Sequence, residues 1–150
     1  MKAAVMTGLR APLEIQQLPD PAPGPSDAVV RVEACGICRS DWHIWQGDWS
    51  WAGVELPLPF VLGHEFGGTI EAVGPSVQGF RVGDRVTIPF HRGCGRCANC
   101  FSGRSNICLG GGANFGGFGQ LALVQAAEAN LVHLPDSATA LDASALGGGS

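Results

Sequence analysis

Four cysteines occur close together in a glycine-rich stretch, with the spacing C-x2-C-x2-C-x7-C. They are Cys94, Cys97, Cys100 and Cys108. Thiolates two residues apart on a tight loop converge on one tetrahedral centre, and four thiolates make a closed, structural zinc site. Buried or disulfide-bonded thiols are the alternative, although an ordinary core scatters its cysteines. The spacing therefore predicts a structural zinc site in a lobe of about residues 92–110.

A second group of metal-binding side chains lies upstream, in C-G-I-C-R-S-D-W-H (Cys35–His43) and G-H-E (Gly63–Glu65). One thiolate, one imidazole and the carboxylate beside it can hold a zinc ion with an open coordination position, which a catalytic zinc requires. Cys35 and Cys38 by themselves are a weaker signal, because a lone C-x-x-C also occurs in redox sites and zinc knuckles. The two motifs together favour a second metal centre with a chemical role.

Short strands must position both groups, because 23 glycines and 10 prolines punctuate the chain at short intervals. We expect strands at residues 1–6, 28–33, 69–73, 85–88, 119–124 and 131–134. Helices are expected over Arg39–Gln46 and Ala138–Leu146, the second capped by Asp136 or Ser137. Strands at this spacing favour a barrel or a sandwich, so the expected fold class is mainly β.

Length, charge and hydropathy exclude several classes of function. A chain of 150 residues can bury one sizeable core, so one domain is expected. The net charge of −4, without a basic run, argues against a nucleic-acid partner. No apolar stretch approaches ~20 residues, and Met1–Arg10 lacks the pattern of a secretion signal. We therefore expect a cytoplasmic protein without a membrane partner, whose cysteines stay reduced.

The order and spacing of these motifs resemble those of the zinc-containing medium-chain alcohol dehydrogenases. The resemblance runs from Met1 to about Gly147, and it includes P-A-P-G-P at Pro21, E-A-V-G at Glu71 and V-G-D-R-V at Val82. It implies a GroES-like β-barrel with a few short helices and a zinc-binding lobe, which is the main part of the catalytic domain in that family. The implied reaction interconverts an alcohol with an aldehyde or ketone by hydride transfer to or from NAD(P).

The resemblance also implies roles at the catalytic zinc. Cys38 and His64 would be zinc ligands, and Glu65 would be an alternating ligand or a residue that tunes the charge on the metal. Asp41 would orient His64 through its second ring nitrogen. Cys35 has no implied role and is expected to be a packed thiol.

Three further residues of the first motif acquire roles from the same resemblance. Ser40 would hydrogen-bond the substrate hydroxyl, and His43 would pass the released proton to solvent. Arg39 would contact the pyrophosphate of the coenzyme, a task that suits a guanidinium. A solvated helix start is the alternative for Arg39 and Ser40.

The loop from Trp42 to Phe60 contains all the tryptophans of the chain. Trp49 and Trp51, together with Phe90 farther along, would wall an apolar substrate pocket and favour bulky or aromatic alcohols. Ordinary packing of large rings beside the barrel is an equally strong alternative.

Two departures from the family bear on what this chain does. A nucleotide-binding Rossmann domain, with its G-x-G-x-x-G fingerprint, is not found in the sequence. The position that aligns with the third protein ligand of the catalytic zinc is Gly148. We expect a GroES-like domain over residues 1–146, followed at 147–150 by a Gly/Ser linker or a cloning scar.

These departures lead to two hypotheses about function. The first is the catalytic-domain portion of a zinc alcohol dehydrogenase, with weak or no ordinary NAD-dependent activity and no tight NAD(P) binding. It would act on a small alcohol, aldehyde or ketone, with zinc as Lewis acid, and retain at most slow reduction with a diffusible hydride donor. The second is a non-catalytic, zinc-stabilised scaffold or binding module. In either case the face left by the absent domain is expected to favour self-association.

Overall fold

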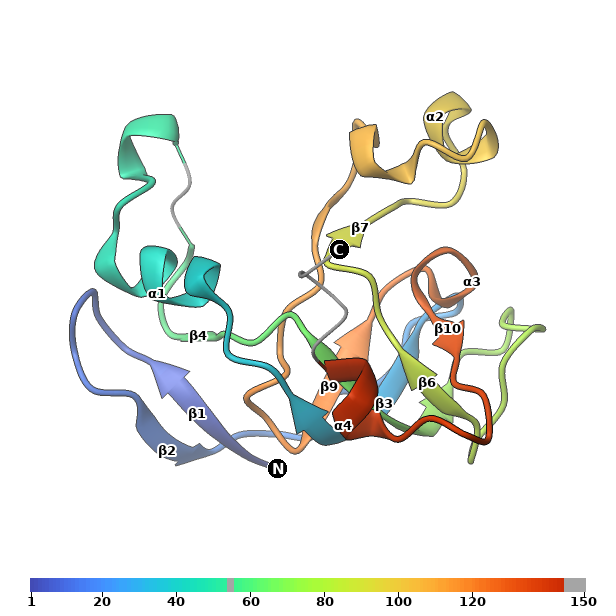
Figure 1. The fold of residues 1–150 in the computed structure, drawn as a ribbon, viewed down its shortest axis with the longest axis horizontal. Helices are drawn as coiled ribbons and strands as arrows, with labels where there is room; N and C mark the ends of the chain where they lie inside the picture. Colours follow the sequence, from blue (N-terminus) through green and yellow to red (C-terminus); the bar gives the residue numbers. More distant parts are fainter. Residues whose placement is uncertain (54–55, 145–150) are drawn as a thin grey trace.

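The computed structural model describes residues 1–53 and 56–144, and its strands form two antiparallel sheets and a short ribbon (Figure 1). The larger sheet has the order β10-β6-β5-β3-β9, with strands at Val132–His133, Arg85–Thr87, Phe66–Val73, Ala28–Cys35 and Leu121–Val124. The smaller sheet has the order β2-β1-β4, with strands at Glu14–Gln17, Lys2–Met6 and Phe60–Val61. The ribbon pairs β7 (His91–Arg92) with β8 (Gly112–Ala113). The predicted mainly β fold is confirmed.

The helices of the described residues are short. They are α1 (Arg39–Gln46), α2 (Ala98–Phe101), α3 (Ala127–Asn130) and α4 (Ala140–Ser144), with 3₁₀ turns at Ser50–Ala52 and Ser105–Ile107. The predicted helix over Arg39–Gln46 is confirmed at both ends. Within the described part of the chain, no helix has the length and hydropathy needed to cross a bilayer.

The central strands β3 and β5 bring the two upstream motifs together. Their antiparallel register pairs Ala28 with Val73 at one end and Cys35 with Phe66 at the other. The C-G-I-C motif therefore begins where β3 ends, at the same edge of the sheet where β5 follows G-H-E. Residues 35–38 and 63–65, distant in sequence, become neighbours as a consequence of strand pairing.

The core lies against this central pair of strands. Val30 and Ile70 face each other across the two strands, and each is 1% exposed. Because successive side chains of a strand point to opposite faces, such pairs build one apolar layer. The buried members of this layer are Ala28, Val30, Phe66, Ile70, Val86, Ile88, Ala122, Val124, Ala127 and Leu131.

Helix α4 packs against β3, β5 and β6, and its N-terminal cap differs from the prediction. Neither Asp136 nor Ser137 caps it. The Thr139 hydroxyl accepts a hydrogen bond from the Asp142 N–H at 3.1 Å, and the Asp142 carboxylate accepts one from the Thr139 N–H at 2.8 Å. This reciprocal pair satisfies two N–H groups at the helix start, so the helix begins at Ala140. The predicted end at Leu146 and the Gly/Ser segment at 147–150 lie outside the described residues.

Candidate metal centres

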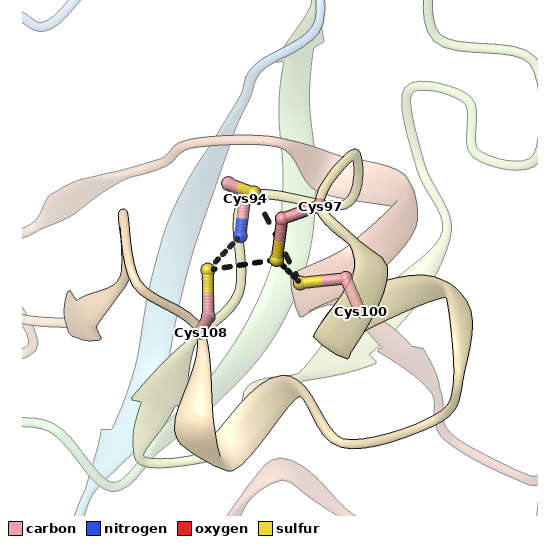
Figure 2. A group of neighbouring side chains, drawn as sticks. All are labelled: Cys94, Cys97, Cys100 and Cys108. Atoms are coloured by element: carbon pink, nitrogen blue, oxygen red, sulfur yellow. Dashed lines mark hydrogen bonds between the residues drawn. The ribbon is translucent and has the colours of Figure 1, made fainter.

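The four-cysteine lobe stands away from the larger sheet and carries α2 (Figure 1). Figure 2 shows the four cysteine side chains pointing toward one another. The sulfur atom of Cys97 lies 3.6 Å from that of Cys100 and 3.8 Å from that of Cys108. The sulfur atoms of Cys94 and Cys100 are 4.0 Å apart. Tetrahedral zinc with Zn–S bonds of about 2.3 Å requires S···S separations of about 3.8 Å. The donor set and its spacing therefore fit a structural zinc ion.

The backbone of the lobe prepares these thiols to bind a cation. The N–H of Arg96 lowers the pKa of the Cys94 thiol to about 6, and the N–H of Cys100 lowers the pKa of Cys97. A hydrogen bond from the Cys94 N–H favours the Cys108 thiolate, yet burial and the neighbouring thiols raise the pKa of Cys108 to about 11. Clustered thiolates share protons in this way, and a metal ion displaces the last of them on binding.

A buried asparagine, which the sequence analysis did not single out, fastens the lobe to the sheet body. Asn130 is 1% exposed. Its Oδ1 accepts a hydrogen bond from the Gly93 N–H at 2.8 Å, and its Nδ2 donates to the Gly93 carbonyl at 2.8 Å. Nδ2 also faces the carbonyls of Gln125 and Ala126 at 2.8 and 3.2 Å. One side chain thereby ties the start of the lobe to the end of α3.

The second centre forms where the upstream motifs meet. Ligand atoms of Cys38, His64 and Glu65 all lie within 4.8 Å of one another. His64 is 1% exposed and Glu65 is 8% exposed, so both donors are held away from bulk water. One sulfur, one nitrogen and one carboxylate oxygen match the donor types that zinc accepts. These residues therefore fit a metal ion with coordination positions left for other ligands.

The Asp41 carboxylate organises this centre through three hydrogen bonds. Its Oδ1 accepts hydrogen bonds from the Gly63 N–H at 3.0 Å and pairs with His64 Nδ1 at 3.1 Å, while Oδ2 accepts from the Cys38 N–H at 3.1 Å. With Nδ1 engaged, His64 presents Nε2 to the centre. Asp41 is 3% exposed, so these hydrogen bonds are shielded from water.

Ser40 lies between two of the three donors. Its hydroxyl oxygen is 3.2 Å from the Cys38 sulfur and 2.9 Å from His64 Nε2. Burial disfavours the thiolate, but hydrogen bonds from Ser40 and His64 lower the pKa of Cys38. Burial also disfavours the imidazolium, but hydrogen bonds to Asp41 and Cys38 raise the pKa of His64. The lowered pKa of Cys38 favours its thiolate, which is the form that binds a metal ion.

Two glycines of the motifs are required by close contacts. A Cβ atom at Gly36 would lie 2.6 Å from the Glu65 carboxylate and 2.6 Å from the Ser144 carbonyl. Gly63 has φ of 85° and no room for a side chain, since a Cβ atom there would lie 2.6 Å from the Phe118 ring. A larger residue at Gly36 would displace the Glu65 carboxylate, and one at Gly63 would displace Phe118 and Cys35.

Comparison with known proteins decides the family. Residues 24–136 match the model of the alcohol dehydrogenase GroES-like domain. The chain belongs to this family. The resemblance seen in the motifs, and the GroES-like fold that it implied, are confirmed.

Relatives and solved structures are similar over nearly the whole of this GroES-like domain. An L-threonine 3-dehydrogenase from Rhizobium etli (strain CIAT 652) is 41% identical over 140 residues, which cover 91% of this chain and 40% of that protein. An NAD-dependent alcohol dehydrogenase structure has a TM-score of 0.86 at 34% identity, covering 98% of this chain and 43% of the other. A cobalt- and zinc-bound thermostable alcohol dehydrogenase from Pyrobaculum aerophilum has a TM-score of 0.84 at 30% identity, covering 97% and 44%. The chain spans about two fifths of the relatives' length.

The GroES-like domain places the remaining predicted site residues around helix α1. Arg39 is exposed, with its guanidinium carbon 5.0 Å from the centre of the Trp42 ring. His43 pairs through Nδ1 with Asp48 at 2.8 Å and stacks on Trp49 with ring centres 5.5 Å apart. The position of the expected third ligand, Gly148, lies outside the described residues.

The predicted aromatic pocket is only partly assembled. Phe90 packs against His64 with ring centres 4.8 Å apart. Trp49 instead packs with the small cluster of buried residues around Met6, and Trp51 is 84% exposed. Among the described aromatic contacts, neither tryptophan meets Phe90. Phe115, which sequence reasoning missed, lies near the centre instead, 5.6 Å from the His64 ring.

Cys35 is a packed thiol, as expected from its lack of an implied role. Its sulfur lies against Gly63 and Gly117, where added Cβ atoms would approach it to 2.9 and 2.5 Å. Burial raises the pKa of Cys35 to about 11. Cys35 does not belong to the cluster of ligand atoms formed by Cys38, His64 and Glu65, and a thiol that stays protonated is not a ready nucleophile.

Proposed function

We propose that this chain is the zinc- and alcohol-binding portion of a zinc-dependent alcohol dehydrogenase that exchanges hydride with NAD(P). The observation that carries the proposal is the convergence of Cys38, His64 and Glu65 within 4.8 Å. The NAD-dependent alcohol dehydrogenase among the structural neighbours supports the coenzyme. The relatives named as L-threonine 3-dehydrogenases support a small alcohol with a secondary hydroxyl group as substrate.

Each residue of the centre has a distinct task in this proposal. Cys38 and His64 would hold the zinc ion, and Glu65 would complete or exchange its coordination. A bound zinc ion supplies Lewis acidity, which makes an alcohol hydroxyl easier to ionise. Asp41 keeps the His64 ring in one orientation and one tautomer.

Two side chains of helix α1, Ser40 and His43, would carry the proton of the alcohol to solvent. Ser40, half-buried at the centre, would accept the hydrogen bond of the substrate hydroxyl and would release its own hydroxyl proton as it takes up that of the substrate. His43 lies one turn later on the same side of α1, and its side chain is 30% exposed. His43 would deliver the proton to solvent, and its Nδ1 pairs with the Asp48 carboxylate at 2.8 Å. The exposed guanidinium of Arg39 would meet the coenzyme pyrophosphate.

The zinc content of the chain tests this proposal. Protein purified without added metal should contain about two zinc ions per chain, and Cys38→Ala should contain about one. Elemental analysis of the purified full chain measures both. Cys35→Ala is the matched control: it removes a neighbouring thiol that does not face the centre, so its zinc content should equal that of the wild type.

A different pattern of zinc content would favour the scaffold hypothesis. About one zinc ion in both the wild type and Cys38→Ala would mean that the four-cysteine lobe alone is filled. The lobe would then have a stabilising role, and the protein would be a zinc-stabilised binding module.

A further inference from the structure

Asn114 is a buried side chain that contacts residues 89–91 and belongs to neither ligand set. It is 4% exposed and directly follows β8. Its Nδ2 donates to the carbonyl of Pro89 at 3.0 Å and faces that of His91 at 3.4 Å, and its backbone N–H donates to the Phe90 carbonyl at 3.0 Å. Three successive carbonyls of one segment are therefore held by a single residue.

The segment that Asn114 holds carries one of the two aromatic rings against His64. Phe90 is the central residue of this segment, and its ring meets the imidazole at 4.8 Å with an interplanar angle of 64°. Phe115, the next residue after Asn114, meets the same imidazole at 5.6 Å and 83°. Asn114 thus sits at the junction of the two segments that bring phenyl rings to the metal-binding histidine.

The two rings differ in how much surface they leave free. Phe90 is 40% exposed despite its contact with His64, so part of its apolar surface remains accessible. Phe115 is half-buried and packs edge-on against Phe60, with ring centres 5.2 Å apart. Both rings pack against the small cluster of buried residues around Met6. A ligand bound at the open metal position would meet aromatic surface here.

We propose that Asn114 is a positioning residue that fixes Phe90 and Phe115 as an aromatic wall selecting apolar substituents on the alcohol. The inference rests on the proposed function, because the wall adjoins the metal position that the substrate oxygen would occupy. A buried Asn donor suits the task, since loss of its N–H groups leaves two carbonyls of the segment without their side-chain donor. The backbone hydrogen bond from residue 114 to Phe90 would remain, but the segment would be held less firmly against His64.

Binding of two related probes to the cobalt-substituted full chain tests the proposal. Imidazole and 4-phenylimidazole both occupy an open metal position through a ring nitrogen, and only the second carries a phenyl group that can reach the wall. Visible absorption of Co²⁺ reports each dissociation constant without any catalytic turnover. The wild type should bind 4-phenylimidazole about tenfold more tightly than imidazole, because the phenyl ring is buried against apolar surface.

Two variants should remove this preference. In Asn114→Ala and in the isosteric Asn114→Asp, the two probes should bind within about twofold of each other, while the affinity for imidazole itself stays unchanged. Cobalt content of about two per chain shows that each variant remains folded. Asn99→Ala is the matched control, because it removes one asparagine-to-carbonyl hydrogen bond, to Ile107 in the lobe, away from the wall. Its preference should equal that of the wild type.

The outcomes separate this inference from the function on which it rests. A tenfold preference that survives in both Asn114 variants overturns the inference and leaves the proposed function intact. Failure of imidazole to alter the cobalt spectrum of the wild type, or a spectral change that persists in Cys38→Ala, overturns the proposed function and the inference with it.

Discussion

Asn130→Ala should lower the free energy of unfolding of the zinc-loaded chain by about 3 kcal/mol. The substitution removes a side chain that is 1% exposed and that engages both the N–H and the carbonyl of Gly93. Gly93 is itself buried, so its polar groups would lose their partners without gaining water. Each buried group left unsatisfied costs about 1–3 kcal/mol. Urea denaturation followed by circular dichroism measures the change.

The same substitution should also loosen the four-cysteine lobe. Gly93 immediately precedes the first zinc ligand, so zinc should transfer to a chelator faster from Asn130→Ala than from the wild type. Asn106→Ala is the control: this asparagine belongs to the same lobe but is exposed, and its substitution should change stability by less than ~0.5 kcal/mol. Equal stability and equal zinc release for the two variants would contradict the fastening role of Asn130.

The four-cysteine cluster could be predicted from the sequence because its signal is local. Metal ligands must be close in space, and short spacings such as those of the four cysteines enforce closeness along the chain. Helix Arg39–Gln46 was predictable at both ends for a similar reason. Asp41 lies in its first turn and Gly47 adopts the left-handed conformation that ends it, with φ of 78°. The strands of the larger sheet could be predicted because glycines and prolines divide the chain into short segments.

The residues that the sequence did not reveal act over long distances. Asn130 reaches Gly93 across 37 positions, and Asn114 reaches Pro89 across 25. A single asparagine in a glycine-rich or alanine-rich stretch has the composition of an ordinary loop, and its burial depends on elements far away in the chain. The ring of Phe115 is a similar case, because only the fold places it beside His64.

The short elements were missed for a different reason. Strands β4, β7 and β8 have two residues each, and helices α2 and α3 have four. A periodic pattern cannot be recognised over so few residues. In α4 the cap was assigned too early, since Asp136 and Ser137 are as good capping residues by type as Thr139. Only the reciprocal hydrogen bonds with Asp142 distinguish the true cap.

Asp41→Asn should weaken zinc binding at the Cys38 and His64 centre by about 10–100-fold while leaving the four-cysteine site filled. The carboxylate accepts three hydrogen bonds, from the Cys38 N–H, the Gly63 N–H and His64 Nδ1. An amide of the same size turns an NH₂ group toward at least one of these donors. The His64 ring then loses the partner that directs Nε2 to the centre. Competition with a chromophoric chelator measures the change. In the variant, the chelator should remove one zinc ion per chain at a lower concentration than in the wild type, while the second ion stays bound.

A second carboxylate–histidine pair in the same helix region provides the control for this prediction. Asp48 pairs with His43 at 2.8 Å, the same chemistry as Asp41 with His64, but the pair is partly exposed and His43 lies outside the ligand cluster. Asp48→Asn should therefore leave both zinc affinities unchanged. Its effect would fall instead on proton transfer to solvent. If Asp41→Asn and Asp48→Asn retained zinc equally well, the hydrogen bonds of Asp41 would serve packing alone, and the orientation of His64 would have to come from Phe90 and Phe115.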